Sequence, residues 1–196
     1  MAKSNYLAWE IDPRAFDELK TERERIAFLV NFLVLAPSSH NSQPWRVTVG
    51  ESEILLSPEY LRSLPESDPH HRELYVSLGC ALKNLLTAAD YYGMSRVVDY
   101  FPPEFSHDIR ITFGNPSASA RDPRHAALAI PRRSTNRAPY DEPFDDTSFC
   151  DWIKGLSSDV ISSDVISDGV KKGKIADVVS NALVAAMDNP EFRHEL

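Results

Sequence analysis

The stretch LAPSSHNSQPWRVTV, residues 35–49, decides how the rest of the chain is interpreted. It ends an apolar run that predicts a buried helix over residues 21–36, stopped by Pro37. A polar loop follows, and WRVTV (45–49) then alternates as a strand does. Hydroxyl and amide side chains in this loop are expected at the edge of the core, where they suit a flat polar ligand; they are Ser38, Ser39, Asn41 and Gln43. The alternative is an ordinary helix stop followed by a hydrogen-bonded turn.

Hydrophobic periodicity places further elements along the chain. Asp68 and Pro69 are typical of a helix N-cap and a first helical residue, and a long buried helix is expected to run from there to Gly93. Strands are expected at 45–49 and 53–57, which form a hairpin, and at 95–101 and 107–113. The later elements are helices over about 122–130, 145–156, 168–188 and 190–196, and a strand over 157–167. The last helix has no stop signal, so we expect a natural chain that continues beyond Leu196.

Composition excludes several classes of protein. A formal net charge of −8 argues against general nucleic-acid binding, which needs a positive surface. No apolar run approaches the roughly 20 residues of a membrane span, and the N-terminus lacks a secretion signal, so a cytoplasmic protein without membrane partners is expected. Cys80 and Cys150 have neither metal-site spacing nor the density of a disulfide scaffold, and both are interpreted as reduced thiols.

A local excess of arginine interrupts this acidic average between residues 121 and 137, where five arginines stand against the single acid Asp122. Arg133 and Arg137 flank two hydroxyl side chains, Ser134 and Thr135. Together they can bind a phosphate through charge-assisted hydrogen bonds, each contributing about 1.5–3 kcal/mol. The alternative is a solvated basic loop whose arginines pair with the many carboxylates of the chain.

Other combinations of residues are weaker candidates for chemistry. Ser39 and His40 have no third group to orient the histidine, which disfavours a hydrolase. Neighbouring His70 and His71 would lie about 100° apart around a helix, which disfavours a metal site. With seven glycines in the chain, no glycine-rich nucleotide loop is present.

The three tryptophans, Trp9, Trp45 and Trp152, are spread along the chain. Large aromatic side chains of this kind mostly fill cores and packing surfaces. Trp45 lies close enough to the polar loop in sequence to border a ligand.

Three stretches together resemble motifs of the FMN-dependent nitroreductase family. APSSHNSQPW (36–45) resembles its Pro-Ser-Ser-x-Asn-x-Gln-Pro-Trp loop, GCALKNLLTAADYYG (79–93) its core helix, and RRSTNRAPYDEP (132–143) its Arg-x-Ser-x-Arg phosphate motif. The order of the first and third motifs is reversed from most of the family. This order, and DPHHRELYVSLGCAL (68–82), are similar to a branch in which two family halves are fused in tandem. Residues 1–120 are then expected to form a first half, and 121–196 the start of a second.

The resemblance implies a fold and a cofactor. The fold is α+β, with a central, mostly antiparallel sheet flanked by helices. The cofactor is FMN, whose phosphate and ribityl chain would be held by Arg133, Ser134, Thr135 and Arg137. Its isoalloxazine ring would lie along Pro37, Ser38, Ser39 and Asn41. Thr135 replaces the family's serine and keeps the hydroxyl.

The resemblance also implies an activity. Family members use NADH or NADPH to reduce nitroaromatics, quinones or other small electron-poor acceptors. Because the flavin carries the electrons, we name no catalytic side chain and no metal. The family builds flavin sites between two halves or two subunits, so a homodimer is expected if the chain is complete at Leu196. Two alternatives stay open: a protein that binds or sequesters FMN with little turnover, and a lobe that binds no flavin at this length.

Overall fold

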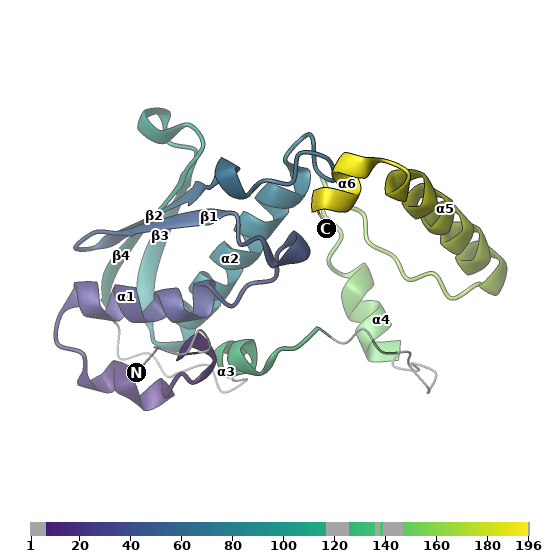
Figure 1. Ribbon diagram of the computed structural model, residues 1–196. Coiled ribbons are helices and arrows are strands. Elements are labelled where there is room, and N and C mark those ends of the chain that lie inside the picture. Colours follow the sequence, from purple (N-terminus) through teal and green to yellow (C-terminus); the bar gives the residue numbers. More distant parts are fainter. Residues whose placement is uncertain (1–6, 117–125, 136–137, 139–146, 196) are drawn as a thin grey trace. The chain divides into compact units, whose positions relative to one another are not determined.

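The computed structural model describes residues 7–116, 126–135, 138 and 147–195, and it divides the chain into two compact units (Figure 1). The first unit is Met1–Ser134 and contains the sheet. The second unit is Thr135–Leu196, and its described secondary structure consists of helices joined by loops. The family halves expected at 1–120 and 121–196 remain a prediction, because compactness alone does not assign a segment to a half.

Four strands form one antiparallel sheet in the order β1-β2-β4-β3. They are β1 (Trp45–Val49), β2 (Glu53–Pro58), β3 (Met94–Tyr100) and β4 (Ile109–Pro116). All four lie within two or three residues of their predicted positions. Alternation along the strands points one set of side chains at the helices, and Ile54, Leu56 and Ile111 of this set are fully buried.

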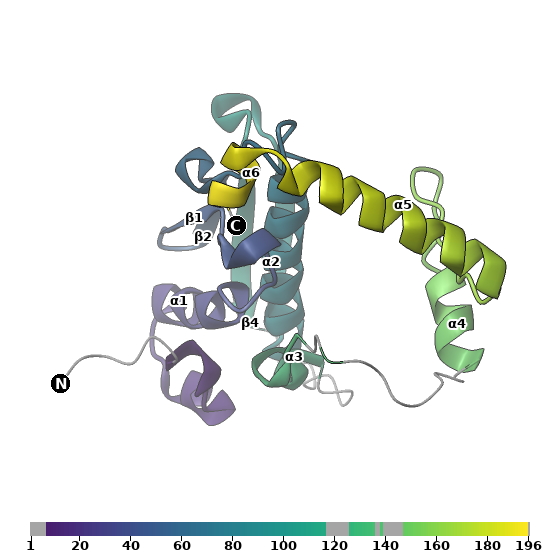
Figure 2. The same cartoon turned by 45° about the vertical axis from the view of Figure 1, so that its right-hand side comes forward.

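Helices α1 (Glu22–Leu33) and α2 (Arg72–Tyr91) lie side by side on the same face of this sheet (Figures 1 and 2). α1 begins with a capping box: the Thr21 hydroxyl accepts a hydrogen bond from the Glu24 N–H, and the Glu24 carboxylate accepts one from the Thr21 N–H. α2 buries leucines and alanines at helical spacing along most of its length. The predicted α+β fold with an antiparallel sheet and flanking helices is confirmed.

The start of α2 differs from the prediction. Pro69 was the expected first residue, whereas the helix begins at Arg72, after His71 with a φ of 55°. Asp68 nevertheless serves the helix start, because its buried carboxylate accepts a hydrogen bond from the Leu74 N–H at 2.9 Å. At the other end Gly93 has a φ of 69°, in agreement with its predicted role as the residue that terminates the helix.

The segment after the sheet contains α3 (Ala126–Ala129), continued by the 3-10 turn Ile130–Arg132. This is part of the helix expected over 122–130, of which residues 122–125 lie outside the described residues. In the second unit α4 (Thr147–Lys154), α5 (Gly169–Met187) and α6 (Pro190–Glu195) correspond to predicted helices. No helix in the described part of the chain has the length and apolar character needed to cross a membrane.

The predicted strand over 157–167 is wrong. In the structure this segment is a loop, in which the Ser157 hydroxyl accepts a hydrogen bond from the Ser163 N–H at 2.9 Å. Val160 is 92% exposed, and no described strand pairs with the segment. Two adjacent Val-Ile pairs therefore did not suffice to form a strand, because a strand also needs a neighbour for its backbone hydrogen bonds.

Candidate functional site

A cavity of about 570 Å³ in the first unit brings together two segments that lie far apart in the sequence. Its described lining residues are Trp9, Val34, Leu35, Ala36, Asn41, Gln43 and Arg133. Asn41 comes from the polar loop and Arg133 from the arginine-rich stretch. The volume is within the range of about 300–1,000 Å³ that is usual for small-molecule and cofactor sites.

The C-terminal end of α1 positions two of these side chains. Carbonyl groups in the last turn of a helix lack helical partners and carry partial negative charge. The Gln43 amide donates to the Val34 carbonyl at 3.0 Å, and the Arg133 guanidinium donates to the Leu35 carbonyl at 3.3 Å. The end of α1 therefore holds an amide and a cation in the wall of the cavity.

The loop after α1 has an unusual backbone. His40, Asn41 and Gln43 have φ angles of 51°, 55° and 48°, in the left-handed region that non-glycine residues rarely adopt. Each such residue costs on the order of 1–3 kcal/mol, with asparagine at the lower end. Ser38 compensates within the loop, because its hydroxyl accepts a hydrogen bond from the Gln43 N–H at 2.9 Å and its carbonyl accepts one from the Asn41 N–H at 3.0 Å. The loop thereby holds Asn41 in the cavity wall.

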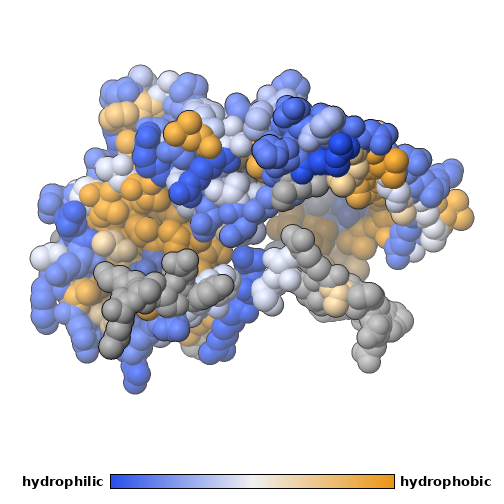
Figure 3. Space-filling view, viewed as in Figure 1, coloured by the Kyte–Doolittle hydropathy of each residue, from blue (hydrophilic) through white to orange (hydrophobic). Residues whose placement is uncertain are grey.

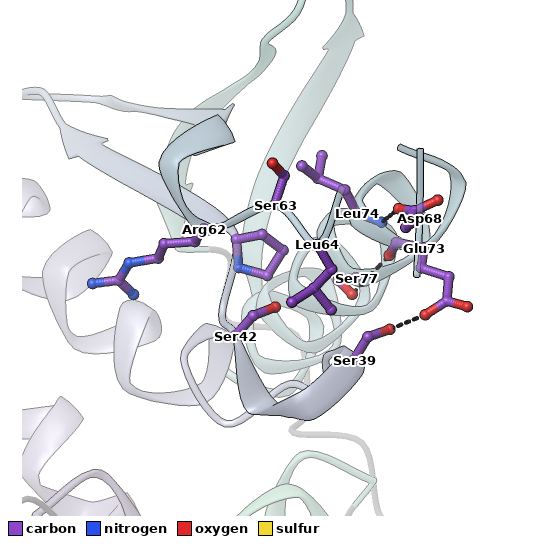
Figure 4. A pocket seen from close by; sticks show the side chains of 10 residues that line it. Ser39, Ser42, Arg62, Ser63, Leu64, Asp68, Glu73, Leu74 and Ser77 are labelled. Atoms are coloured by element: carbon purple, nitrogen blue, oxygen red, sulfur yellow. Dashed lines mark hydrogen bonds between the residues drawn. The ribbon is translucent and has the colours of Figure 1, made fainter. Parts of the chain in front are cut away.

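Ser39 faces a different cavity from Asn41. Its hydroxyl donates a short hydrogen bond to the Glu73 carboxylate in the first turn of α2 (Figure 4). The cavity beside this contact is about 10 Å³, close to the space that one water molecule needs, and Asp68 and Ser77 also line it. The contact attaches the polar loop to α2.

The structure brings together some of the predicted site residues and not others. Asn41 and Arg133 line the large cavity. Ser38 and Ser39 use their hydroxyls within the protein, and neither is among the residues that line it. Pro37, Ser134 and Thr135 are exposed, with Thr135 in the second unit, and Arg137 lies outside the described residues. The cofactor roles of these residues stay predictions.

Trp9 lines the cavity although no sequence motif selects it. Trp45, the tryptophan expected to border a ligand, is only 8% exposed and belongs to the core. The short 3-10 helix Leu7–Trp9 packs against the turn Ile130–Arg132, which directly precedes Arg133. This contact joins the two ends of the first unit, so local periodicity could not have revealed it.

A pair of tyrosines connects α2 with the turn Tyr60–Arg62. The hydroxyl oxygens of Tyr60 and Tyr75 are 3.0 Å apart. Burial, and then the hydrogen bond with Tyr60, raise the pKa of Tyr75 to about 12. Neither tyrosine lines the large cavity, and a phenol with this pKa stays protonated near neutral pH, so we interpret the pair as structural.

The side chains in the large cavity fit the FMN that the sequence resemblance implies. The Arg133 guanidinium supplies the positive charge and planar donors that a phosphate needs. The Asn41 side chain carries both a donor and an acceptor, which suits the alternating carbonyl and N–H groups of a flavin ring. Within the described residues no group of three or more His, Cys, Asp or Glu side chains is arranged for a metal ion, and Cys80 and Cys150 are free thiols.

The chain is similar to proteins of Mycobacterium tuberculosis. One, named "Putative NAD(P)H nitroreductase", is 33% identical over 129 residues, which are 65% of this chain and 38% of the relative. Another, named "Putative NAD(P)H nitroreductase acg", is 31% identical over 139 residues, or 69% of this chain and 42% of the relative. An "Uncharacterized protein" is 30% identical over 176 residues, or 82% of this chain and 48% of the relative. No model of a protein family matches the chain.

These matches cover less than half the length of each relative. They agree with the nitroreductase-like character of the predicted fold. The tandem arrangement of two halves stays a prediction.

Proposed function

We propose that the chain is a flavoprotein that binds FMN and uses NADH or NADPH to reduce nitroaromatics, quinones or similar electron-poor molecules. The observation that carries the proposal is that Asn41 and Arg133, one from each predicted flavin motif, line the same cavity. The names of the relatives support the same class of reaction. When bound, the flavin supplies the hydride and electron transfer.

The residues of the chain bind and orient the cofactor in this proposal. Arg133 holds the phosphate, and Asn41 and Gln43 meet the polar edge of the ring. Ser134, Thr135 and Arg137 are proposed to contact the phosphate and ribityl chain, and Pro37, Ser38 and Ser39 to lie along the ring. The two serines would do so with their backbone, because their hydroxyls form hydrogen bonds within the protein. No side chain is proposed as a general acid or base.

The polar wall of the cavity is ordered before a ligand binds. The carbonyls of Val34 and Leu35, directly after α1, already accept hydrogen bonds from Gln43 and Arg133, and the Ser38 hydroxyl already accepts one within the strained loop. Groups that are fixed in the free protein lose little conformational entropy on binding. The free-energy cost of the strained loop backbone is therefore part of folding and not of ligand binding. The guanidinium and amide groups of the cavity are in position before a ligand binds.

An absorption spectrum of the purified chain, before and after addition of FMN, tests this proposal directly. We expect a flavin spectrum, bleaching under anaerobic conditions with NADH or NADPH, and recovery of the colour when a quinone or nitroaromatic is added. Bound FMN that does not bleach would favour the alternative, a protein that binds or sequesters FMN with little turnover. A chain that remains colourless with excess FMN would contradict both.

A further inference from the structure

We infer that Trp9 is the stacking wall of the large cavity, so that the cavity binds a planar aromatic phosphate with its ring against Trp9 and its phosphate at Arg133. The inference rests on the proposed flavin site and adds to it a residue outside the predicted motifs. It divides the cavity into a ring subsite and a phosphate subsite that can be tested separately.

Trp9 is held in place by its neighbours while its ring stays open. Ala8 packs against the core, and the turn is closed by a hydrogen bond from the Glu10 N–H to the Leu7 carbonyl at 3.1 Å. Trp9 itself is 40% exposed, and its indole has no hydrogen bond or ring contact with the other described residues. Tryptophan side chains usually bury their large apolar surface in the core. A partly exposed indole at a cavity can therefore contact a ligand.

The ring subsite and the phosphate subsite belong to one framework. The turn that carries Trp9 packs against Ile130–Arg132, and Arg133 follows this segment directly. The hydrogen bond from Arg133 to the Leu35 carbonyl fixes the same segment to the end of α1. Trp9 and Arg133 are therefore positioned by contacts within the first unit.

The remaining described lining residues have no aromatic ring, and the half-buried Val34 has a much smaller apolar side chain than Trp9. Leu35 and Ala36 are buried, at 4% and 3% exposure, so they offer the cavity little of their side chains. Asn41, Gln43 and Arg133 are polar, and Trp9 is the one aromatic residue among the described residues that line the cavity. A planar ring that stacks on it gains more contact area than an aliphatic phosphate of the same charge does.

The test compares FMN with riboflavin, which has the same ring and no phosphate. Removal of an aromatic stacking partner weakens binding about 5- to 100-fold, which corresponds to about 1–3 kcal/mol. We expect Trp9→Leu to lower the affinities for FMN and riboflavin by the same factor in this range, and Trp9→Phe to restore most of both affinities. Arg133→Ala should lower the affinity for FMN and leave the affinity for riboflavin unchanged. Affinities are measured by equilibrium dialysis.

The matched control is Trp152→Leu, an equally large change at a tryptophan of the second unit that is 59% exposed. It should leave both affinities unchanged, and circular dichroism and thermal unfolding should show that every variant is folded. In addition, FMN should quench less of the tryptophan emission in Trp9→Phe than in the wild type. FMN binding by the wild type with unchanged affinities in Trp9→Leu would overturn this inference alone. Absence of FMN binding by the wild type would overturn the proposed function as well.

Discussion

Asn41 combines two properties that rarely occur in one residue, a left-handed backbone and a side chain in a cavity wall. Asparagine tolerates this backbone better than most residues, because its short amide can form local hydrogen bonds. The identity of residue 41 can therefore serve the backbone, the ligand or both. Glycine separates the two roles, since it accepts the same φ and has no side chain.

Asn41→Gly should weaken FMN binding by about 0.5–1.5 kcal/mol, the usual net value of one hydrogen bond. The free energy of unfolding should change by no more than about 1 kcal/mol, because glycine relieves backbone strain but gains entropy in the unfolded chain. Calorimetric titration and urea unfolding measure the two quantities. Asn41→Leu is a poorer test, since leucine in the left-handed region adds about 1–2 kcal/mol of strain. Lower stability with full FMN affinity would make Asn41 a purely structural residue.

Arg133→Ala should weaken FMN binding by about 1.5–3 kcal/mol, because it removes the proposed cationic partner of the phosphate. It should also lower the free energy of unfolding by about 0.5–1.5 kcal/mol, since the Leu35 carbonyl loses a donor. Arg132→Ala is the matched control: Arg132 is the neighbouring arginine, is exposed as Arg133 is, and is not among the described residues that line the cavity. Arg137→Ala is expected to act as Arg133→Ala does. Unchanged FMN affinity in Arg133→Ala would reject the phosphate assignment.

At the scale of elements, one hydrogen bond joins the polar loop to α2, from Ser39 to Glu73. A double-mutant cycle of Ser39→Ala and Glu73→Ala should give a coupling energy of about 0.5–1.5 kcal/mol in urea unfolding. The cycle cancels the separate effect of Glu73 on the helix dipole, which appears in both arms. Additive effects of the two substitutions would show that the contact does not hold the loop.

The tyrosine pair predicts a dependence of stability on alkaline pH. The pKa of Tyr75 is raised from 10.0 to about 12 in the folded protein, so folding favours the protonated phenol. The stabilisation is complete below pH 10 and is lost as the pH rises from about 10 towards 12. Tyr75→Phe should remove this component of the pH dependence, measured by urea unfolding across the range. An ultraviolet titration of the folded protein that shows no tyrosine ionising above the normal value would contradict the assignment.

The elements that sequence predicted well have signals confined to a few residues. Alternation and turn residues predict the hairpin of β1 and β2. Helical spacing and the stop signal at Gly93 predict the C-terminal part of α2 and the helices of the second unit. The segment 157–167 has β-branched residues typical of a strand, in adjacent Val-Ile pairs, but no described strand pairs with it, and pairing is a tertiary property. The start of α2 shifted because Asp68 reaches Leu74 across a turn that begins the helix later.

The residues of the candidate site also divide into those that the sequence predicted and those that it could not predict. Motif resemblance selected Asn41 and Arg133, and the structure places both in one cavity. It could not select Trp9, because that residue reaches the cavity only through the packing of the N-terminal turn against Ile130–Arg132. Nor could it foresee that Ser38 and Ser39 form hydrogen bonds inside the protein, which depends on the strained course of the loop.

At the scale of the whole molecule, α5 is a long helix with exposed apolar side chains. None of its residues is buried in the part of the chain that the structure describes, and Figure 3 shows hydrophobic side chains along it. Val179 and Leu183 are 60% and 55% exposed and lie one turn apart on the same face. Contiguous apolar surface of this kind is typical of a site of protein association.

The resemblance to a family with paired flavin halves leads us to expect a homodimer in solution. We expect this dimer to bury the exposed face of α5. Each buried valine or leucine contributes about 1.5–3 kcal/mol, so Val179→Asp with Leu183→Asp should convert the dimer to a monomer in light scattering after gel filtration. Asn181→Asp adds the same type of charge on the opposite face of α5 and should leave the dimer intact. A wild-type chain that is monomeric at every concentration, or a doubly substituted chain that stays dimeric, would exclude α5 as the contact between copies.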